Sequence, residues 1–210
     1  MVSHGSVPAA AEHRGALWWR FDEERPALSS ASVGGGLRRL GWVLNIGVDH
    51  DYRRTDLDAH AAEVAAPLGL HGPGTALLTA ADVGAVTTAT EDGVQAWTTV
   101  GVTRPTWPAD RSAVALAGRR LPPGTINTVV VLDARLSESA LVQAALGAAE
   151  AKAQACVEAG IGGTGTASDA LVLIGAADGP EQEFGGVRSV WGCRVALAVH
   201  AAVAAGLRPA

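Results

Sequence analysis

With 210 residues and a formal net charge of −5 at pH 7, the chain is long enough for one domain with a large buried core. It lacks the broad positive field that attracts nucleic acids. Its two cysteines, Cys156 and Cys193, provide neither a disulfide framework nor a thiolate zinc site. The N-terminus has no secretory signal pattern, and no uninterrupted apolar run of about 18 residues occurs. We therefore expect a soluble, cytoplasmic protein that binds neither nucleic acid nor membranes.

Strands are predicted where β-branched or aromatic residues gather between turn-forming residues. These segments are 16–21, 42–48, 86–90, 94–100, 123–133 and 170–174. The two that flank Glu91-Asp92-Gly93 form the clearest hairpin, because Asp-Gly readily takes the positive φ of a tight turn. The proline-containing segment from Thr103 to Pro123 is expected to be a loop at the rim of a site.

Helices are predicted at residues 56–66, 137–159 and 187–205, where apolar residues recur at helical spacing. Thr55 and Asp58 fit a capping box at the start of the first helix, and Gly206 is expected to end the last. The middle helix is the most regular of the three. Its predicted buried stripe consists of Leu141, Val142, Ala145, Leu146, Ala149, Ala153, Cys156 and Val157.

These elements predict a single compact domain of the α/β class (α+β-like), in which helices pack on a mixed β-sheet. The domain is expected to span residues 14–207, after a disordered segment at residues 1–13. The buried strands in 123–133 and 170–174 are each entered through a Gly-Thr turn. Their starts would bring hydroxyls and backbone N–H donors together in a cleft that can hold an amide substrate.

Thr125 stands at the mouth of one of these strands, directly after Gly124. A hydroxyl fixed there suits a nucleophile or a positioning donor, although threonine is also simply common in strands and turns. The turn before the other strand contains Thr164, Thr166 and Asp169. It resembles an anion-binding loop, but a nucleotide P-loop would need a lysine and a following helix.

Lys152 and Glu150 lie on opposite borders of the predicted buried stripe of helix 137–159. A lysine beside apolar packing can act as a base or as an oxyanion donor, and Glu150 could orient it or a water. The alternative is an ordinary amphipathic border. The histidines have no metal-ligand spacing, so neither a metal nor another cofactor is expected.

Taken together, several segments resemble the adenosylcobinamide amidohydrolase (CbiZ) family, in an order and spacing that span most of the chain. They are Ser29–Gly36, Trp42–Asn45, Asp51–Asp56, Gly74–Asp82, Pro123–Asn127, Glu150–Lys152 and Gly163–Asp169. The resemblance implies hydrolysis of the amide that joins aminopropanol to the corrin ring, which gives adenosylcobyric acid in cobinamide salvage (cobalamin biosynthesis). The implied partner is this corrinoid substrate, and homo-oligomerisation stays open.

Within these matching segments, we expect Thr125, Lys152 and Glu150 to be catalytic. The residues expected to bind substrate are Asn45, Asp56, Asn127, Thr164, Thr166 and Asp169. A fainter resemblance, to ornithine acetyltransferases and DmpA-type aminopeptidases, places Thr125 at their nucleophile position after Gly124. It implies acyl transfer through Thr125, with an oxyanion held by backbone N–H groups. Self-cleavage before Thr125 would free its amine as a base.

Two other functions stay compatible with the residues alone. A non-catalytic corrinoid-binding protein could use Trp97, Trp107 and Trp191 to cover apolar ring faces. An amidohydrolase for another amide, such as a peptide or an acylated amino acid, would use the same hydroxyls.

Overall fold

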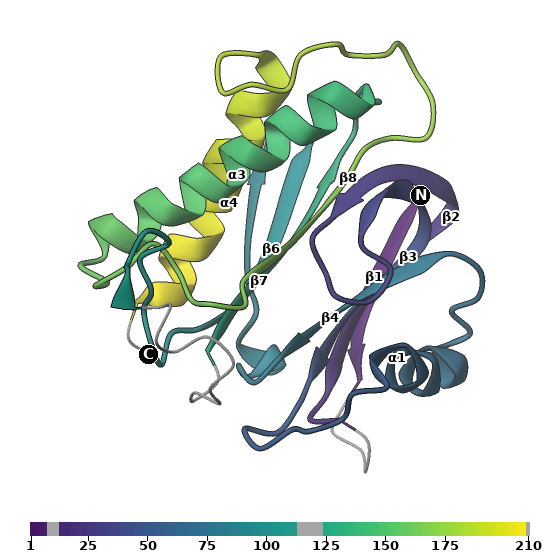
Figure 1. Cartoon of the computed structure of the whole chain (residues 1–210). Helices are drawn as coiled ribbons and strands as arrows, with labels where there is room; N and C mark the ends of the chain where they lie inside the picture. The colour runs from purple at the N-terminus through teal and green to yellow at the C-terminus, as the bar shows by residue number, and fades with distance from the viewer. Residues whose placement is uncertain (8–12, 113–123, 209–210) are drawn as a thin grey trace.

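The computed structural model describes residues 1–7, 13–112 and 124–208. Within them, eight strands form one mixed sheet in the order β4-β3-β2-β8-β7-β6-β5, with β1 paired to β2. The strands are β1 (Val2–Val7), β2 (Ala16–Ser29), β3 (Gly36–Gly47), β4 (Gly74–Thr79), β5 (Thr87–Glu91), β6 (Val94–Gly101), β7 (Thr125–Leu132) and β8 (Ala170–Ile174). The helices are α1 (Leu57–Ala65), α3 (Glu138–Glu158) and α4 (Val190–Leu207), with short 3-10 turns η1 (Ala66–Leu68) and η2 (Val83–Ala85). The predicted fold class is confirmed (Figure 1).

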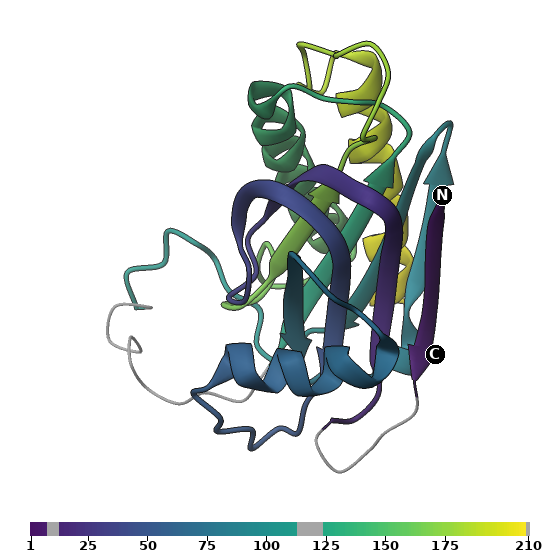
Figure 2. The ribbon, with the colours of Figure 1, turned by 90° about the vertical axis from the view of Figure 1, so that its right-hand side faces the viewer.

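The sheet bends so that one half lies over the other. The pairing of β2 with β3 shifts register between Arg20 and Arg25, and β2 pairs with β8 only over Ala27–Ser29. The first half of β2 pairs with β1 instead. Its Trp19 ring meets the ring of Trp97 in β6 edge to face, with centroids 5.7 Å apart. The strands therefore form two facing layers, joined by the bent β2–β3 hairpin (Figure 2).

Helices cover the outer faces of both strand layers, which gives four layers in the order helix, strand, strand, helix. The helices α3 and α4 lie side by side on the β5–β8 layer, and α1 lies against β3 on the other side (Figure 1). Side chains of β7 alternate between the two cores that flank it. Val129 and Val131 enter the core between the strand layers, whereas Ile126 and Val130 face α3 and α4.

The buried face of α3 consists mostly of small residues, so the predicted stripe is partly wrong. Leu141, Ala145 and Cys156 are buried as predicted. Val142, Leu146 and Val157 are instead 38%, 63% and 52% exposed. Alanines occupy the contact with α4 and the sheet, where they allow the backbones to approach closely; they are Ala140, Ala144, Ala148, Ala151 and Ala155.

Several predicted boundaries are confirmed and others are wrong. The β5–β6 hairpin turns through Asp92 and Gly93 with φ of 30° and 81°, as predicted. Residues 2–7 form a strand rather than a disordered segment, because they pair antiparallel with residues 16–21 of β2. Asp56 rather than Thr55 is the N-cap of α1, and it makes no side-chain cap bond. The helix α4 continues through Gly206 to Leu207. Of the predicted loop at 103–123, residues 113–123 lie outside the described residues.

One helix in the described part of the chain, α4, is long and apolar enough to cross a membrane by length and composition alone. In this fold it packs on α3, β5 and β6. Its Val195, Val199 and Val203 are buried in the core beneath α3. These contacts are those of a core helix.

Candidate active site at the starts of β7 and β8

Thr125 is the first residue of β7, and its side chain is 5% exposed. Strand alternation puts it on the same face as Val129, the face toward the second strand layer. Its Oγ1 lies 2.7 Å from Ser168 Oγ, and the Ser168 hydroxyl is 3.0 Å from the Gly124 carbonyl oxygen, to which it can donate. When Ser168 donates its only proton to Gly124, Thr125 must donate to Ser168. In this arrangement the O–H bond of Thr125 points toward Ser168.

Asp169 ties together three elements through its two carboxylate oxygens. Oδ1 accepts the backbone N–H of Ile126 at 2.9 Å and the Thr166 hydroxyl at 2.6 Å. Oδ2 accepts the Thr166 N–H at 3.0 Å and lies 2.5 Å from Lys152 Nζ. The side chains of Lys152 and Asp169 are 21% and 11% exposed, so this ion pair is mostly removed from water. It anchors the start of β7 and the loop before β8 to α3.

The Thr166 hydroxyl lies 2.6 Å from the Gly124 carbonyl oxygen as well. One hydroxyl carries one proton, so Thr166 can donate to Gly124 or to Asp169 but not to both at once. The carbonyl of Gly124 therefore faces two hydroxyl oxygens, those of Thr166 and Ser168. The peptide bond before Thr125 lies in a polar setting that can stabilise negative charge on this carbonyl oxygen.

The loop that carries these residues passes too close to its neighbours for side chains at two glycines. A Cβ on Gly165 would stand 2.1 Å from Asp169 Oδ2 and 2.5 Å from Lys152 Nζ. A Cβ on Gly163 would stand 2.5 Å from the backbone nitrogen of Thr106. Thr106 donates its N–H to Gly165 and accepts the N–H of Thr164, at 2.9 and 3.1 Å. Thr164 thus joins the site through its backbone.

A buried amide network lies on the same face of β7 as Thr125. Asn127 Nδ2 donates to Asn45 Oδ1 at 2.8 Å and to the Leu78 carbonyl at 3.0 Å. Asn45 Nδ2 donates to Thr99 Oγ1 at 3.0 Å. The backbone acceptor Leu78 fixes which end of the Asn127 amide is the nitrogen. Within the described residues, the buried Asn127 Oδ1 has no hydrogen-bond partner.

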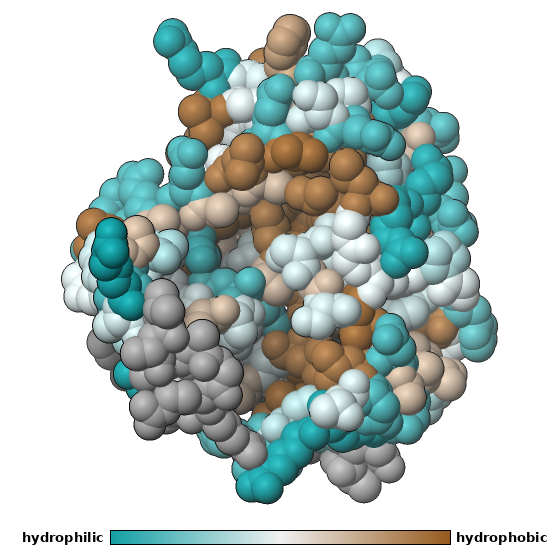
Figure 3. Space-filling view, viewed as in Figure 1, coloured by the Kyte–Doolittle hydropathy of each residue, from teal (hydrophilic) through white to brown (hydrophobic). Residues whose placement is uncertain are grey.

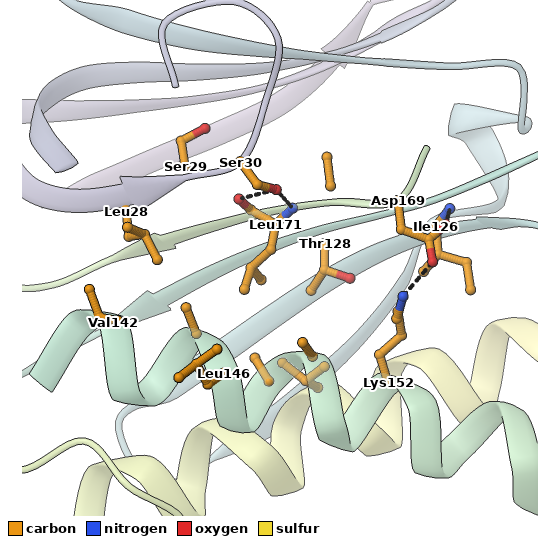
Figure 4. Close-up of a pocket in the computed structure, with 15 residues that line it drawn as sticks. Leu28, Ser29, Ser30, Ile126, Thr128, Val142, Leu146, Lys152, Asp169 and Leu171 are labelled. Atoms are coloured by element: carbon orange, nitrogen blue, oxygen red, sulfur yellow. Dashed lines mark hydrogen bonds and ion pairs between the residues drawn. The ribbon is translucent and has the colours of Figure 1, made fainter. Parts of the chain in front are cut away.

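A cavity of about 300 Å³ lies on the other face of β7, beneath α3. Figure 4 shows Leu28 and Val142 toward one end, and the Lys152–Asp169 ion pair at the other. Ile126, Lys152 and Asp169 belong both to this cavity and to the surroundings of Thr125. Thr125 itself does not line it, and its walls are mainly apolar. The prediction of a cleft lined by Gly and Thr is therefore wrong for this cavity.

The structure brings most of the predicted site residues together, but not all. Thr125, Thr166, Asp169 and Lys152 form one cluster, with Asn45 and Asn127 in the adjacent network. Asp56 lies at the start of α1 in an ion pair with Arg54. Glu150 is exposed on α3, and Lys152 pairs with Asp169 instead. The catalytic and substrate-binding roles of all these residues stay predictions.

Ser168 is a site residue that the sequence analysis missed. It is the direct partner of the Thr125 hydroxyl, yet it stands exposed in the turn before Asp169. The available signal was its position in the Gly163–Asp169 segment, beside three residues that had been selected. A turn residue whose hydroxyl reaches another strand can be recognised only once the two strand starts are known to be neighbours.

Two further observations concern the buried cysteine near this site and the residues that could bind a metal. Burial raises the pKa of the Cys156 thiol, an effect that Lys152 opposes and Asp169 reinforces, so a reactive thiolate is disfavoured. No group of three or more His, Cys, Asp or Glu that could hold a metal occurs in residues 1–7, 13–112 and 124–208.

Two solved structures have a fold similar to that of this chain. A Burkholderia sp. beta-aminopeptidase matches with a TM-score of 0.51 at 14% identity, over 98% of this chain and 83% of that chain. The PH0078 protein from Pyrococcus horikoshii OT3 matches with a TM-score of 0.51 at 13% identity, over the same shares. At these identities the likeness shows the fold alone, which this chain shares with both structures.

The family is shown by sequence. The pattern that defines the family described as CbiZ: Adenosylcobinamide amidohydrolase matches residues 2–210, and the chain belongs to this family. A relative from Methanosarcina mazei, named Adenosylcobinamide amidohydrolase, is 28% identical over 187 residues, which are 85% of this chain and 88% of the relative. The resemblance predicted from the motifs is confirmed, and the match includes the residues of β1.

Proposed function

We propose that this protein is an amidohydrolase that cleaves the amide between aminopropanol and the corrin side chain of adenosylcobinamide. The products are adenosylcobyric acid and aminopropanol, as cobinamide salvage requires. Family membership over residues 2–210 supports the substrate. The observation that carries the chemistry is the hydrogen-bonded chain from Thr125 through Ser168 to the Gly124 carbonyl, braced by the Lys152–Asp169 ion pair.

In the proposed reaction, Thr125 Oγ1 attacks the carbonyl carbon of the substrate amide. Its proton passes to a base, and from that base to the nitrogen of the leaving amine. Backbone N–H groups of the Gly163–Asp169 loop hold the oxyanion. The C–N bond then breaks, the amine departs with a proton, and an ester to Thr125 remains. Water hydrolyses this ester, which releases the corrin carboxylate and restores the threonine.

The base that finally takes the proton depends on the state of the chain. In an uncleaved chain, Lys152 or a bound water has to accept it. Lys152 is held in an ion pair with Asp169, so a route through Lys152 requires this pair to open. In a chain cleaved before Thr125, the free amine of Thr125 is adjacent to its own hydroxyl and can serve as the base.

The geometry around Gly124 supports such self-cleavage. Attack of Thr125 Oγ1 on the Gly124 carbonyl carbon would put negative charge on an oxygen that lies 2.6 and 3.0 Å from the Thr166 and Ser168 hydroxyls. The C–N bond would break to give an ester, and water would release a Gly124 carboxylate. Mass spectrometry under denaturing conditions should then show fragments 1–124 and 125–210, and a Thr125→Ala protein should stay intact. A wild-type protein of full mass would exclude this route.

The test of function is incubation of the purified protein with adenosylcobinamide, followed by detection of aminopropanol and adenosylcobyric acid. Release of both in equal amounts supports the proposal. Binding of the corrinoid without release would indicate a non-catalytic corrinoid-binding protein. Hydrolysis of a dipeptide or an N-acyl amino acid, but not of adenosylcobinamide, would indicate a different amidohydrolase.

The proposal includes a cytoplasmic location for this reaction. Its support is the state of the two cysteines, which are unpaired, as is usual in a reducing compartment.

A further inference from the structure

The cavity beneath α3, which we call the slot, exists because small residues of α3 leave space above β7 and β8. Ala145 and Ala149 face this space, and Leu146 stands at its mouth with 63% of its surface exposed. Figure 3 shows apolar side chains in a band above a hollow of the surface. Elsewhere α3 packs closely on α4 and the sheet. An open apolar slot of about 300 Å³ in a packed protein is an expected feature of a ligand-binding site.

The polar groups on the slot walls already have partners within the protein. The Ser30 hydroxyl accepts the N–H of Leu171 at 2.9 Å, and Thr128 pairs with Thr98 at 3.2 Å. Ser29 pairs with Thr75 at 2.9 Å. A ligand group rich in donors and acceptors would lose its hydrogen bonds to water here without replacement. The slot therefore suits an apolar part of a ligand.

One end of the slot is formed by two members of the catalytic cluster, Lys152 and Asp169, whereas the Thr125 side chain lies on the opposite face of β7. Val142 and Lys152 stand ten positions apart on α3, which at a rise of about 1.5 Å per residue is roughly 15 Å. The far end is closed by the Lys152–Asp169 pair, and Asp169 also holds the backbone of Ile126, next to Thr125 (Figure 4). A ligand held in the slot thus has one end beside the start of β7.

We propose that the slot binds the apolar, methyl-bearing edge of the corrin macrocycle, while an amide side chain of the same molecule passes the Lys152–Asp169 pair at the start of β7 to reach Thr125 on the other face of the strand. This inference rests on the proposed function. The volume of about 300 Å³ is at the lower limit for ligand pockets, so only part of a corrinoid enters. The adenosyl group, with its ring nitrogens and ribose hydroxyls, is a poor occupant, because the polar side chains of the slot walls already pair with other groups of the protein.

Binding measurements test the slot independently of catalysis. Equilibrium dialysis would use adenosylcobyric acid, and then cobinamide without an adenosyl group. The proteins are wild type, Ala149→Phe, which fills the slot, and Leu146→Gln, which makes its mouth polar. The matched control is Ala201→Phe on α4, an exposed alanine that does not line the slot. We expect Ala149→Phe to weaken binding of both corrinoids at least tenfold, Leu146→Gln about threefold or more, and Ala201→Phe less than twofold.

The outcomes test the slot proposal separately from the proposed hydrolysis. No binding to wild type, or equal binding to Ala149→Phe and Ala201→Phe, overturns the slot whether or not adenosylcobinamide is hydrolysed. A loss confined to the adenosylated corrinoid also overturns it, because the slot would then hold the adenosyl group. Slot-dependent binding of both corrinoids without any hydrolysis by wild type would support the slot and remove the proposed catalysis. With hydrolysis intact, Ala149→Phe should raise KM at least tenfold and change kcat less than threefold.

Discussion

Gly165 is the position where the candidate site has no room for a side chain. A Cβ there would overlap Asp169 Oδ2 and Lys152 Nζ, and the backbone φ of +148° already disfavours other residues. We expect Gly165→Ala to separate the ion pair and to move the loop that carries Ser168. Because a displacement of about 1 Å can cost 10²-fold in rate, turnover should fall about 100-fold, as aminopropanol release would show.

The matched control for this change is Gly162→Ala in the same loop. Nothing lies within 4 Å of a Cβ at Gly162, so this variant should keep nearly full activity. Thermal denaturation should show a loss of about 1–3 kcal/mol for Gly165→Ala and little change for the control. Equal activity of the two variants would mean that the ion pair has no part in the reaction.

The hydroxyl of Thr125 should be required for turnover but not for folding. Thr125→Ala removes one hydrogen bond, to Ser168, which costs about 1 kcal/mol of stability. Its turnover should be undetectable, since no other group replaces the nucleophile. Thr125→Ser keeps the oxygen and should retain measurable turnover. Wild-type activity in a folded Thr125→Ala protein would remove this residue from the mechanism.

For single residues, the sequence indicates which polar side chains lie near the site, but not which side chains they contact. Helical spacing predicts Lys152 and Glu150 at opposite borders of the buried stripe, with Glu150 able to orient Lys152 or a water. The partner in the structure is Asp169, since neighbouring strand starts bring the loop before β8 beneath α3. Such pairings depend on strand order, which sequence spacing does not contain.

The helix α3 shows how composition misled the prediction of its buried face. Helical spacing predicts a helix at residues 137–159, and the structure has α3 there, with Ser137 as its N-cap and the Ser137 hydroxyl accepting the Ala140 N–H at 3.1 Å. The largest apolar residues were assigned to the core, but Val142 and Leu146 are exposed. Close contact with α4 favours alanine, so the large side chains stay outside. In an alanine-rich helix, burial and side-chain size need not coincide.

The start of α1 should contribute stability that depends on pH. The hydrogen bonds from Arg54 lower the pKa of Asp56 from 3.8 to about 2, and Arg54 lowers the pKa of Glu63 as well. A pKa lower in the folded than in the unfolded state makes the contribution complete above about pH 4 and lost as the pH falls toward 2. Urea denaturation at pH 2 to 6 should show this fall.

In Asp56→Asn, part of this pH dependence should be absent, because the neutral amide cannot titrate. The remaining fall then reports Glu63 and the other carboxyl groups. A curve that is parallel to wild type throughout this range would mean that the ion pair with Arg54 does not persist in solution.

At the scale of the whole molecule, β1 completes one of the two strand layers. The strand pairs with the first half of β2, and the ring of His4 lies 5.2 Å from that of Trp97 in the facing layer. Deletion of residues 1–7 should lower Tm, by roughly 2–4 °C for each kcal/mol lost. It should also shift tryptophan fluorescence to longer wavelength, whereas an unchanged Tm and spectrum would mean that β1 is dispensable.

The antiparallel ladder between β6 and β7 runs from the Val94–Leu132 pair to the Gly101–Thr125 pair. A break in the backbone after Gly124 would therefore fall in the connection between these strands and leave the ladder whole. The two resulting polypeptides would stay bound as a heterodimer and elute from a sizing column like the uncut protein. The cleavage would be detected only after unfolding separates the two polypeptides. A recombinant preparation could therefore contain cleaved and uncleaved protein that behave alike under native conditions.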